Sequence, residues 1–426
     1  MGLFSFFRKK GDTVISGRTN SLENIFSDYK TNLAYGLYYT DADKYNALKL
    51  PRAIVNTFVT STSQEFDFSV DTDNLDINRI SKYLKNNLRI MSNHLCIGGR
   101  MAIKPYLKND RLGVVVYGAK DFQAFYNDFG EIEQVYFRSD IRESEFSSFV
   151  LVEIHTYDVD TREYRIDNQL YEGTNTDTYR KAGFNNSLTI GGRVPLSRCK
   201  KTANLDDFYV IEDVDRHLCA VVNLDNSMQY NKGISIYDSS IELIKEAEKI
   251  HEWMMWEYNG GQLAIDIPAD LLRPVGSSSK NTRYSMPDGC DRLYRKLEGA
   301  PSDFDIKVFS PSLRDENYIR GLNEILKKIE LNCGLYYGAL SNITQDAKTA
   351  TEVIASKQRF YVAVMDIKNR LKECIEEILE NTCVIYNRMM PDFMKEDITV
   401  TFDIGDSVID LVDKGEPNRS ENRQGI

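Results

Sequence analysis

One stretch of this chain, residues 339–390, contains neither glycine nor proline and limits the fold most strongly. These two residues are the usual interrupters of a helix, so a single helix can run through the stretch. Its first part is polar, but Thr349 and Glu352 match a capping box, in which a hydroxyl and a carboxylate bind each other's exposed amides. Apolar residues then recur at helical spacing as far as Pro391. We therefore predict one helix over 349–390, about 42 residues and roughly 60 Å long, which crosses more than one domain.

Composition limits the class of protein. The chain has 426 residues, of which 42% are hydrophobic and 27% charged, and this balance is typical of a globular protein with more than one domain. Its formal charge of -11 argues against tight binding of nucleic acid, because tight binders usually show a basic excess. No window is apolar enough to cross a membrane, and residues 1–10 match neither a secretory signal nor a myristoylation site. The seven cysteines form no C-x-x-C pair and indicate a reduced, cytosolic chain.

The N-terminal half predicts an α+β region. Helical spacing is found over 49–59 and 76–96, and short β-rich runs separated by turn residues follow over 98–171. These runs predict a meandering antiparallel sheet. Residues 172–206 are rich in Gly, Asn, Thr and Ser, and we expect a long surface excursion there.

A helix, a small insert and a second helix precede the long stretch. The first helix is predicted over 235–258, and the insert contains strand-like runs at 262–267 and 304–309 with a short helix around 290–297 between them. The second helix, over 312–336, has one apolar face. The polar or charged residues predicted on its opposite face are Arg320, Asn323, Glu324, Lys327 and Glu330.

No group of residues predicts catalysis, and none predicts a cofactor or a metal site. The histidines lack the paired spacing of zinc ligands, which favours structural roles. Solvated charge is the favoured explanation for Asp206, Asp207 and Glu212 with its acidic neighbours, and a metal-dependent nuclease is a remote alternative that requires these carboxylates to converge in space. Trp253 and Trp256 are expected in a packing cluster, with an anchor in an interface as the second interpretation.

The order of these parts, and several short sequences within them, resembles the portal proteins of tailed bacteriophages, especially the group found in phages of Gram-positive hosts. The similarity runs from about residue 49 to residue 402. Its most specific pieces, in chain order, are GGRMAIKPY at 98–106, GISIY at 233–237, WEY at 256–258, AIDIP at 264–268, FSPSLRD at 309–315, KTATE at 348–352 and SKQR at 356–359.

The resemblance implies a structural protein without enzymatic activity. Portal proteins form a ring, usually of twelve subunits, at one capsid vertex, through which the terminase drives double-stranded DNA and from which the DNA later leaves. The implied locations are the virion and, during assembly, the host cytoplasm. The implied partners are other copies of the chain, double-stranded DNA held transiently and without sequence preference, the terminase, the major capsid and scaffold proteins, and the head-to-tail adaptor, but no membrane. A ring of acidic copies repels a polyanion, which is compatible with weak contact to DNA.

The resemblance also divides the chain into an α/β wing, a two-helix stem, a small α/β clip, a tunnel loop, one long helix and a crown that is reduced or truncated. Carried over by position, the divisions are the N-terminal part of the wing at 1–232, the first stem helix at 233–259, the clip at 260–311, the second stem helix at 312–337, the tunnel loop at 338–348, the long helix at 349–390, and a wing strand with the remnant of a crown at 391–426. The strand is predicted at 398–402. Where portal proteins usually continue into a helical crown, this chain has a short polar segment.

Three groups of functional residues follow from the same carry-over. The tunnel-loop residues expected to face DNA are Leu340, Ser341, Asn342, Ile343, Thr344, Gln345, Asp346 and Lys348. The residues expected to line the channel from the stem are Arg320, Lys327 and Lys328, and those expected to dock partners at the clip are Arg292 and Arg295. Another virion ring protein, such as a connector or a baseplate component, is the main alternative.

Overall fold

The described residues form two compact units. The computed structural model describes residues 19–26, 28–39, 47–108, 111–144, 147–174, 188–224, 233–261, 264–268, 274–275, 283–284, 294–297, 307–342, 350–389 and 397–405. The first unit is drawn from Met1–Glu242 and Ile329–Ile426, and the second from Leu243–Lys328. The chain therefore leaves the first unit once and returns to it once.

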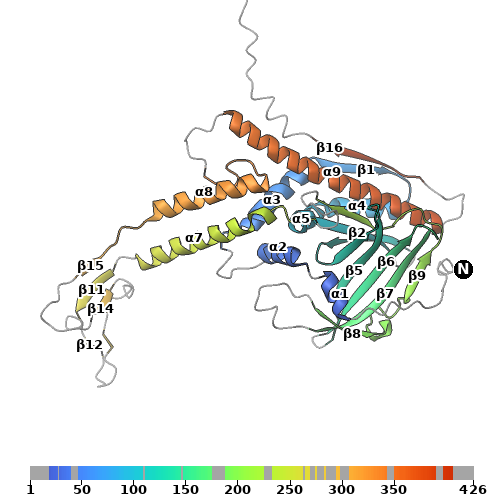
Figure 1. Cartoon of the computed structure of the whole chain (residues 1–426), viewed down its shortest axis with the longest axis horizontal. Coiled ribbons are helices and arrows are strands. Elements are labelled where there is room, and N and C mark those ends of the chain that lie inside the picture. Colours follow the sequence, from blue (N-terminus) through green and yellow to red (C-terminus); the bar gives the residue numbers. More distant parts are fainter. Residues whose placement is uncertain are drawn as a thin grey trace, which may run out of the picture. The chain divides into compact units, whose positions relative to one another are not determined.

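The described residues of the first unit form three antiparallel sheets (Figure 1). The largest has the strand order β4-β5-β6-β7-β8, and β9 also pairs with β7. Its strands are β4 (Phe122–Tyr126), β5 (Ile132–Arg142), β6 (Ser148–Asp158), β7 (Glu163–Thr174), β8 (Thr189–Val194) and β9 (Phe208–Ile211). The second sheet has the order β10-β2-β3, and the third pairs β1 with β16. Their strands are β1 (Phe66–Asp71), β2 (Arg100–Lys108), β3 (Arg111–Gly118), β10 (Ala220–Asn223) and β16 (Thr399–Ile404).

The antiparallel arrangement predicted over 98–171 is confirmed, although its strands belong to two sheets. The prediction of a surface excursion over 172–206 is wrong for its second half, while residues 175–187 lie outside the described residues. Strand β8 pairs with β7, and Leu188 and Ile190 are buried in a cluster with Val150 and Tyr171. The polar composition of the surrounding residues hid this short apolar run.

Six helices of the described residues belong wholly to the first unit. They are α1 (Thr19–Phe26), α2 (Tyr29–Tyr39), α3 (Leu50–Ser63), α4 (Leu75–Asn86), α5 (Leu88–Gly98) and α9 (Ala350–Met389). The long helix predicted over 349–390 is confirmed by α9, and the strand predicted at 398–402 is confirmed by β16. In the described part of the chain, no helix is both long and apolar enough to cross a membrane.

Helix α9 packs against α3, α4 and α5 and against strands β2, β10 and β16 (Figure 1). Its buried apolar residues recur every three or four positions, which places them on one face of the helix. They are Phe360, Val364, Ile367, Leu371, Cys374, Ile375, Ile378, Leu379 and Cys383. This face therefore contacts helices and strands of the N-terminal half of the chain as well as β16 near its C-terminal end.

The single helix predicted over 76–96 is instead two helices, α4 and α5, which meet at Asn87. The Asn87 N–H donates to the carbonyl oxygens of Tyr83 and Leu84, and its side-chain amide also donates to Tyr83. Asparagine competes for backbone hydrogen bonds in this way and is a weak helix former, so α4 ends here although the apolar spacing continues.

The second unit contains a small α/β insert between two helices. The helices are α7 (Ile241–Gly260) and α8 (Asp315–Cys333), and both begin or end in the first unit. The strands are β11 (Ala264–Pro268), β12 (Pro274–Val275), β13 (Arg283–Tyr284), β14 (Tyr294–Leu297) and β15 (Lys307–Phe309). Strand β11 pairs with β14 in parallel and with β15 in antiparallel orientation, so the short helix predicted around 290–297 is wrong over β14. Pairing with β11 overrides the local preference of this segment.

Both helices next to the insert are shorter than predicted. A 3₁₀ turn at Asp238–Ser240 precedes α7, whose first residue is Ile241 rather than residue 235. Helix α8 ends at Cys333 because Gly334 adopts a left-handed backbone with φ of 74°. Two residues predicted on the exposed face of α8 are buried, with Asn323 8% exposed and Glu330 1% exposed.

Replacing Phe360 by alanine should lower the free energy of unfolding by about 3–5 kcal/mol. Phe360 is buried, and its ring lies 5.1 Å from the ring of Phe58 on α3 and 5.3 Å from that of Tyr336. Chemical denaturation of the purified variant measures the loss. The matched control is Val362→Ala on the same helix, where the side chain is 65% exposed and the change should stay within about 0.5 kcal/mol. Equal losses in the two variants would contradict this packing.

Candidate functional site

The segment predicted to face DNA begins where α8 ends. Gly334 and Gly338 have φ of 74° and 83°, which side chains other than glycine rarely tolerate. The Leu335 N–H donates to the Glu330 carbonyl oxygen over 2.9 Å and closes the end of the helix. The structure describes the segment as far as Asn342. Five of the predicted residues lie outside the described residues: Ile343, Thr344, Gln345, Asp346 and Lys348.

The carboxylate of Glu330 organises the described part of this segment. Oε1 accepts hydrogen bonds from the N–H groups of Leu340 and Ser341, both over 2.6 Å. Oε2 accepts from the Gly338 N–H over 3.2 Å and from the Ser341 hydroxyl over 2.9 Å. A hydrogen bond to an ionised carboxylate is about twice as strong as one between neutral groups. The start of the segment is therefore folded around this side chain.

Two of the predicted DNA-facing residues take part in this arrangement. Ser341 is 6% exposed, so its side chain lies against Glu330, whereas Asn342 is exposed. Leu340 is partly exposed and supplies its backbone N–H to the carboxylate. Sequence reasoning missed Glu330, since it assigned this residue to the solvated face of the helix.

An aromatic stack holds the same turn from its other side. Tyr336 packs edge-on against Phe360 of α9, and Phe360 packs against Phe58 of α3. The turn between α8 and the predicted tunnel loop is thus in contact with α9, which in turn packs against α3.

The predicted channel-lining residues lie on the part of α8 that belongs to the second unit. Arg320 donates to the side chain of Asn317 over 2.7 Å, and Lys327 forms an ion pair with Glu324 over 2.6 Å. Lys328 is exposed. Two of the three cations thus bind neighbours on their own helix.

The predicted docking residues of the insert are described only in part. Arg292 lies outside the described residues, and Arg295 is placed by its backbone, opposite Asp266 in the pairing of β14 with β11. A feature that sequence reasoning missed lies next to the insert, where Arg314 binds the carboxylate of Glu257 with its backbone N–H over 2.9 Å and its guanidinium over 2.8 Å. These bonds hold the pKa of Glu257 well below its usual range. They join the end of α7 to the start of α8.

Trp253 and Trp256 are exposed on α7, by 48% and 72%, so the expected packing cluster is wrong for the isolated chain. The Lys249 ammonium lies 4.9 Å from the ring centre of Trp253. Large exposed aromatic side chains one turn apart are typical of a surface that another molecule covers.

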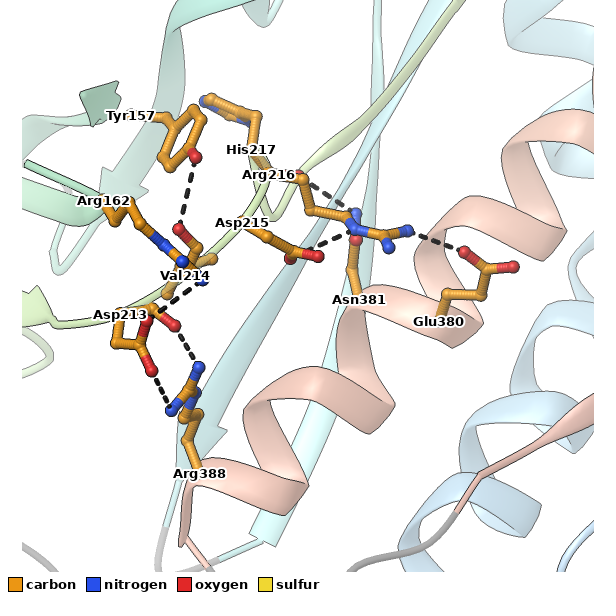
Figure 2. A network of polar contacts seen from close by, with 10 residues as sticks. All are labelled: Tyr157, Arg162, Asp213, Val214, Asp215, Arg216, His217, Glu380, Asn381 and Arg388. Carbon is orange, nitrogen blue, oxygen red and sulfur yellow. Dashed lines mark hydrogen bonds and ion pairs between the residues drawn. The ribbon is translucent and has the colours of Figure 1, made fainter. Parts of the chain in front are cut away.

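Among the acidic residues considered for a nuclease, the neighbours of Glu212 at positions 213 and 215 form ion pairs with arginine. Asp213 forms ion pairs with Arg162 over 3.0 Å and with Arg388 over 2.9 Å, and it lies between the two side chains (Figure 2). Asp207 and Asp206 lie beside Asn168, which donates to their backbone carbonyl oxygens. Among the described residues, no three His, Cys, Asp or Glu side chains converge on a point that could hold a metal ion.

The same network joins the loop between β9 and β10 to the last third of α9 (Figure 2). Arg216 binds Glu380 over 2.8 Å, and the side-chain amide of Asn381 donates to the His217 carbonyl oxygen over 3.3 Å. Exposed pairs of this kind contribute little stability singly, about 0–1 kcal/mol each, but together they fix the register of loop and helix.

Two of the histidines lie in the core next to this loop. The His155 Nδ1 is 2.8 Å from the Tyr164 hydroxyl, which is 3.2 Å from the Cys219 sulfur, and the Cys219 N–H donates to His217 Nδ1. Burial lowers the pKa of His217 to about 4 and that of His155 well below its usual value, while it raises the pKa of Cys219 to about 12. The group is therefore uncharged at neutral pH, as a structural polar cluster should be.

Glu377, on the same part of α9, should make stability depend on pH. Burial raises its pKa to about 7, against the opposing charge of Arg216. Between about pH 4.5 and pH 7 the folded protein keeps a proton on Glu377 that the unfolded chain has already lost. The free energy of unfolding therefore falls as the pH rises from about 4.5 to about 7, and it falls no further through this group above about pH 7. Glu377→Gln, which resembles the protonated form, should raise the free energy of unfolding by roughly 1–2 kcal/mol more at pH 8 than at pH 5.5.

Urea denaturation at the two pH values measures this difference. The control is Glu133→Gln, at an exposed position of β5, which should change stability by less than about 0.5 kcal/mol and nearly equally at both pH values. If Glu377→Gln had the same effect at pH 5.5 and pH 8, its carboxyl group would titrate normally in the folded protein.

The chain is similar to a described family over most of its length. The family model "Phage portal protein, SPP1 Gp6-like" matches residues 23–405. Two solved structures are similar at low identity. "Virion of native gene transfer agent (GTA) particle" has 11% identity and a TM-score of 0.45, with 95% of this chain and 90% of that chain covered. "Neck of empty GTA particle computed with C6 symmetry" has 9% identity and a TM-score of 0.45, with 94% and 93% covered. No curated protein matches.

Proposed function

This chain belongs to the phage portal protein family, and we propose from this premise that twelve copies form a ring through which double-stranded DNA is packaged into the capsid and later ejected. As a member of that family it is a structural protein of the phage particle, a portal ring protein at a capsid vertex, and not an enzyme. The metal-dependent nuclease considered from the sequence is thereby set aside.

The match of the family model to residues 23–405 carries the proposal, and the order of structural parts supports it. A helix leads into a small α/β insert, a second helix returns, and an anchored turn then leads to the long helix. In the proposed assignment, 233–259 and 312–337 are the stem helices, 260–311 is the clip, 338–348 is the tunnel loop, and 349–390 joins the stem to the wing. Residues 1–232 form most of the wing, and 391–426 add a wing strand.

The charge of the chain fits a conduit rather than a tight binder. Each copy has a formal charge of -11, so a ring of copies repels DNA wherever its inner wall shares that sign. Arg320, Lys327, Lys328 and the tunnel loop then supply a few weak contacts to phosphate groups, which contain no sequence information. The DNA slides because few contacts must break at each step.

Closure of a ring requires two different faces on every copy, because the same contact repeats around the axis. We propose that Trp253 and Trp256, exposed on α7, belong to one of these faces. Contact with the next copy would remove the two indole rings from water, which is favourable in proportion to the apolar area buried.

Further partners are proposed from the position of each part. The clip, with Arg292 and Arg295, would dock the terminase during packaging and the head-to-tail adaptor afterwards. The wing would contact the major capsid and scaffold proteins. Assembly would take place in the host cytoplasm and end in the virion. Another ring of the virion, such as a connector or baseplate component, is the alternative, and it would lack a DNA-contacting loop between stem and long helix.

Deletion of residues 343–348 should abolish DNA packaging while rings still form. The deletion spares 338–342, so the bonds to Glu330 are kept. Electron microscopy of the purified variant measures ring formation, and protection of DNA from nuclease in a packaging reaction measures the function. Replacement of the six residues by a Gly-Ser linker of equal length separates loss of contact from loss of length. Packaging at the wild-type level by the deletion variant would rule out the proposed tunnel loop.

Charge reversal in the clip, Arg292→Glu with Arg295→Glu, should weaken binding of the terminase or the adaptor about tenfold or more, since opposed charges at an interface become like charges. Surface plasmon resonance with each purified partner measures the affinity. The control is Lys82→Glu with Arg89→Glu, two exposed positions of the first unit. Unchanged affinity of the clip variant for both partners would place their docking surface elsewhere.

A further inference from the structure

Three properties of Glu330 would make its ionised side chain unfavourable in the folded protein if nothing compensated them. It is an acidic side chain 1% exposed to solvent, it lies in the last turn of α8, and among the described residues no lysine or arginine forms an ion pair with it. Burial of an unpaired charge is costly, and the negative end of the helix dipole disfavours an anion at this position. Something else must compensate this carboxylate.

The compensation comes entirely from the turn that follows the helix. Every hydrogen bond that the described residues donate to this carboxylate comes from Gly338, Leu340 and Ser341. Three backbone N–H groups and one hydroxyl that converge on an anion form the kind of concave site that binds phosphate or carboxylate groups in other proteins. Here a side chain of the same chain fills the site.

The two parts therefore depend on each other. If 338–341 adopted another conformation, a buried carboxylate would lose four donors, and a penalty of this kind exceeds the net gain from ordinary hydrogen bonds. Conversely, without the carboxylate three N–H groups would point at one empty position. The left-handed backbone of Gly338 allows the turn to approach so closely.

We infer that Glu330 is a positioning residue, which holds 338–341, the start of the proposed tunnel loop, in a fixed conformation against α8. This inference rests on the proposed assignment of 338–348 as the tunnel loop. The stack of Tyr336 on Phe360 adds a second attachment, so the root of the loop is held by α8 and α9 together.

Hydrogen exchange of the full-length protein, read by mass spectrometry with fragmentation, tests the lock without DNA. In the wild type, the amides of Gly338, Leu340 and Ser341 should exchange far more slowly than in an unstructured peptide. Glu330→Gln replaces one acceptor oxygen by an N–H donor and should speed their exchange roughly 10- to 100-fold. The control is Glu324→Gln on the exposed face of the same helix, which should leave them unchanged.

Chemical rescue separates positioning from general support of the fold. Glu330→Ala leaves the ring of donors without its anion, and sodium acetate at about 100 mM should slow the exchange of the three amides again by filling that position. Sodium chloride at the same ionic strength should not. Fast exchange of these amides in the wild type would overturn the inference, and this measurement needs no variant. Exchange in Glu330→Gln that matches the wild type, or a rescue by chloride as large as by acetate, would also overturn it.

A packaging reaction with Glu330→Gln rings distinguishes this inference from the proposed function. Reduced packaging by intact rings is expected if the root of the loop must be fixed. If exchange responds as described but neither Glu330→Gln nor deletion of 343–348 affects packaging, the lock is real and the assignment of the tunnel loop fails.

Discussion

Burial of one face of α9 is the constraint on which the first unit depends. Helices α3, α4 and α5 and strands β2, β10 and β16 all pack against α9, and Lys368 of α9 also donates to the carbonyl oxygen of Gly405, next to β16. Most of the stability of a helix in a protein comes from packing of its apolar face rather than from local propensity. The side chains of α9 from Phe360 to Cys383 are buried only when the distant elements assemble around them. Folding of this unit is therefore non-local, since it must join segments separated by most of the chain.

The fold could be predicted where one physical signal dominates. Absence of glycine and proline and a capping box predicted α9 to within a residue at each end. The sequence patterns gave wrong predictions where a second physical effect competes with the one that the pattern reports. The apolar spacing of 76–96 continues past Asn87, but hydrogen bonds from that asparagine to Tyr83 and Leu84 end the helix. The segment of β14 was predicted as a helix because its local sequence contains no sign of its parallel pairing with β11.

The candidate site was harder to predict from the sequence than the fold. The resemblance to portal proteins implied a loop at 338–348, whereas the residue that shapes the start of this segment was assigned to the wrong face of α8. Glu330 occurs at helical spacing among exposed residues, and nothing in the sequence predicts that it is buried. Its partners are backbone N–H groups, which every residue except proline has, rather than side chains of a recognisable type. Side-chain periodicity detects apolar burial and is blind to a carboxylate satisfied by the main chain.

Both tryptophans of the chain lie on α7, one turn apart and exposed to water. Their intrinsic fluorescence therefore reports on one short surface and on nothing else in the molecule. Indole emission shifts to shorter wavelength when its surroundings become apolar, so a solution of isolated chains should emit near the limit of hydrated tryptophan and shift as that surface becomes covered. The molecule thus contains its own optical probe of association, without any label.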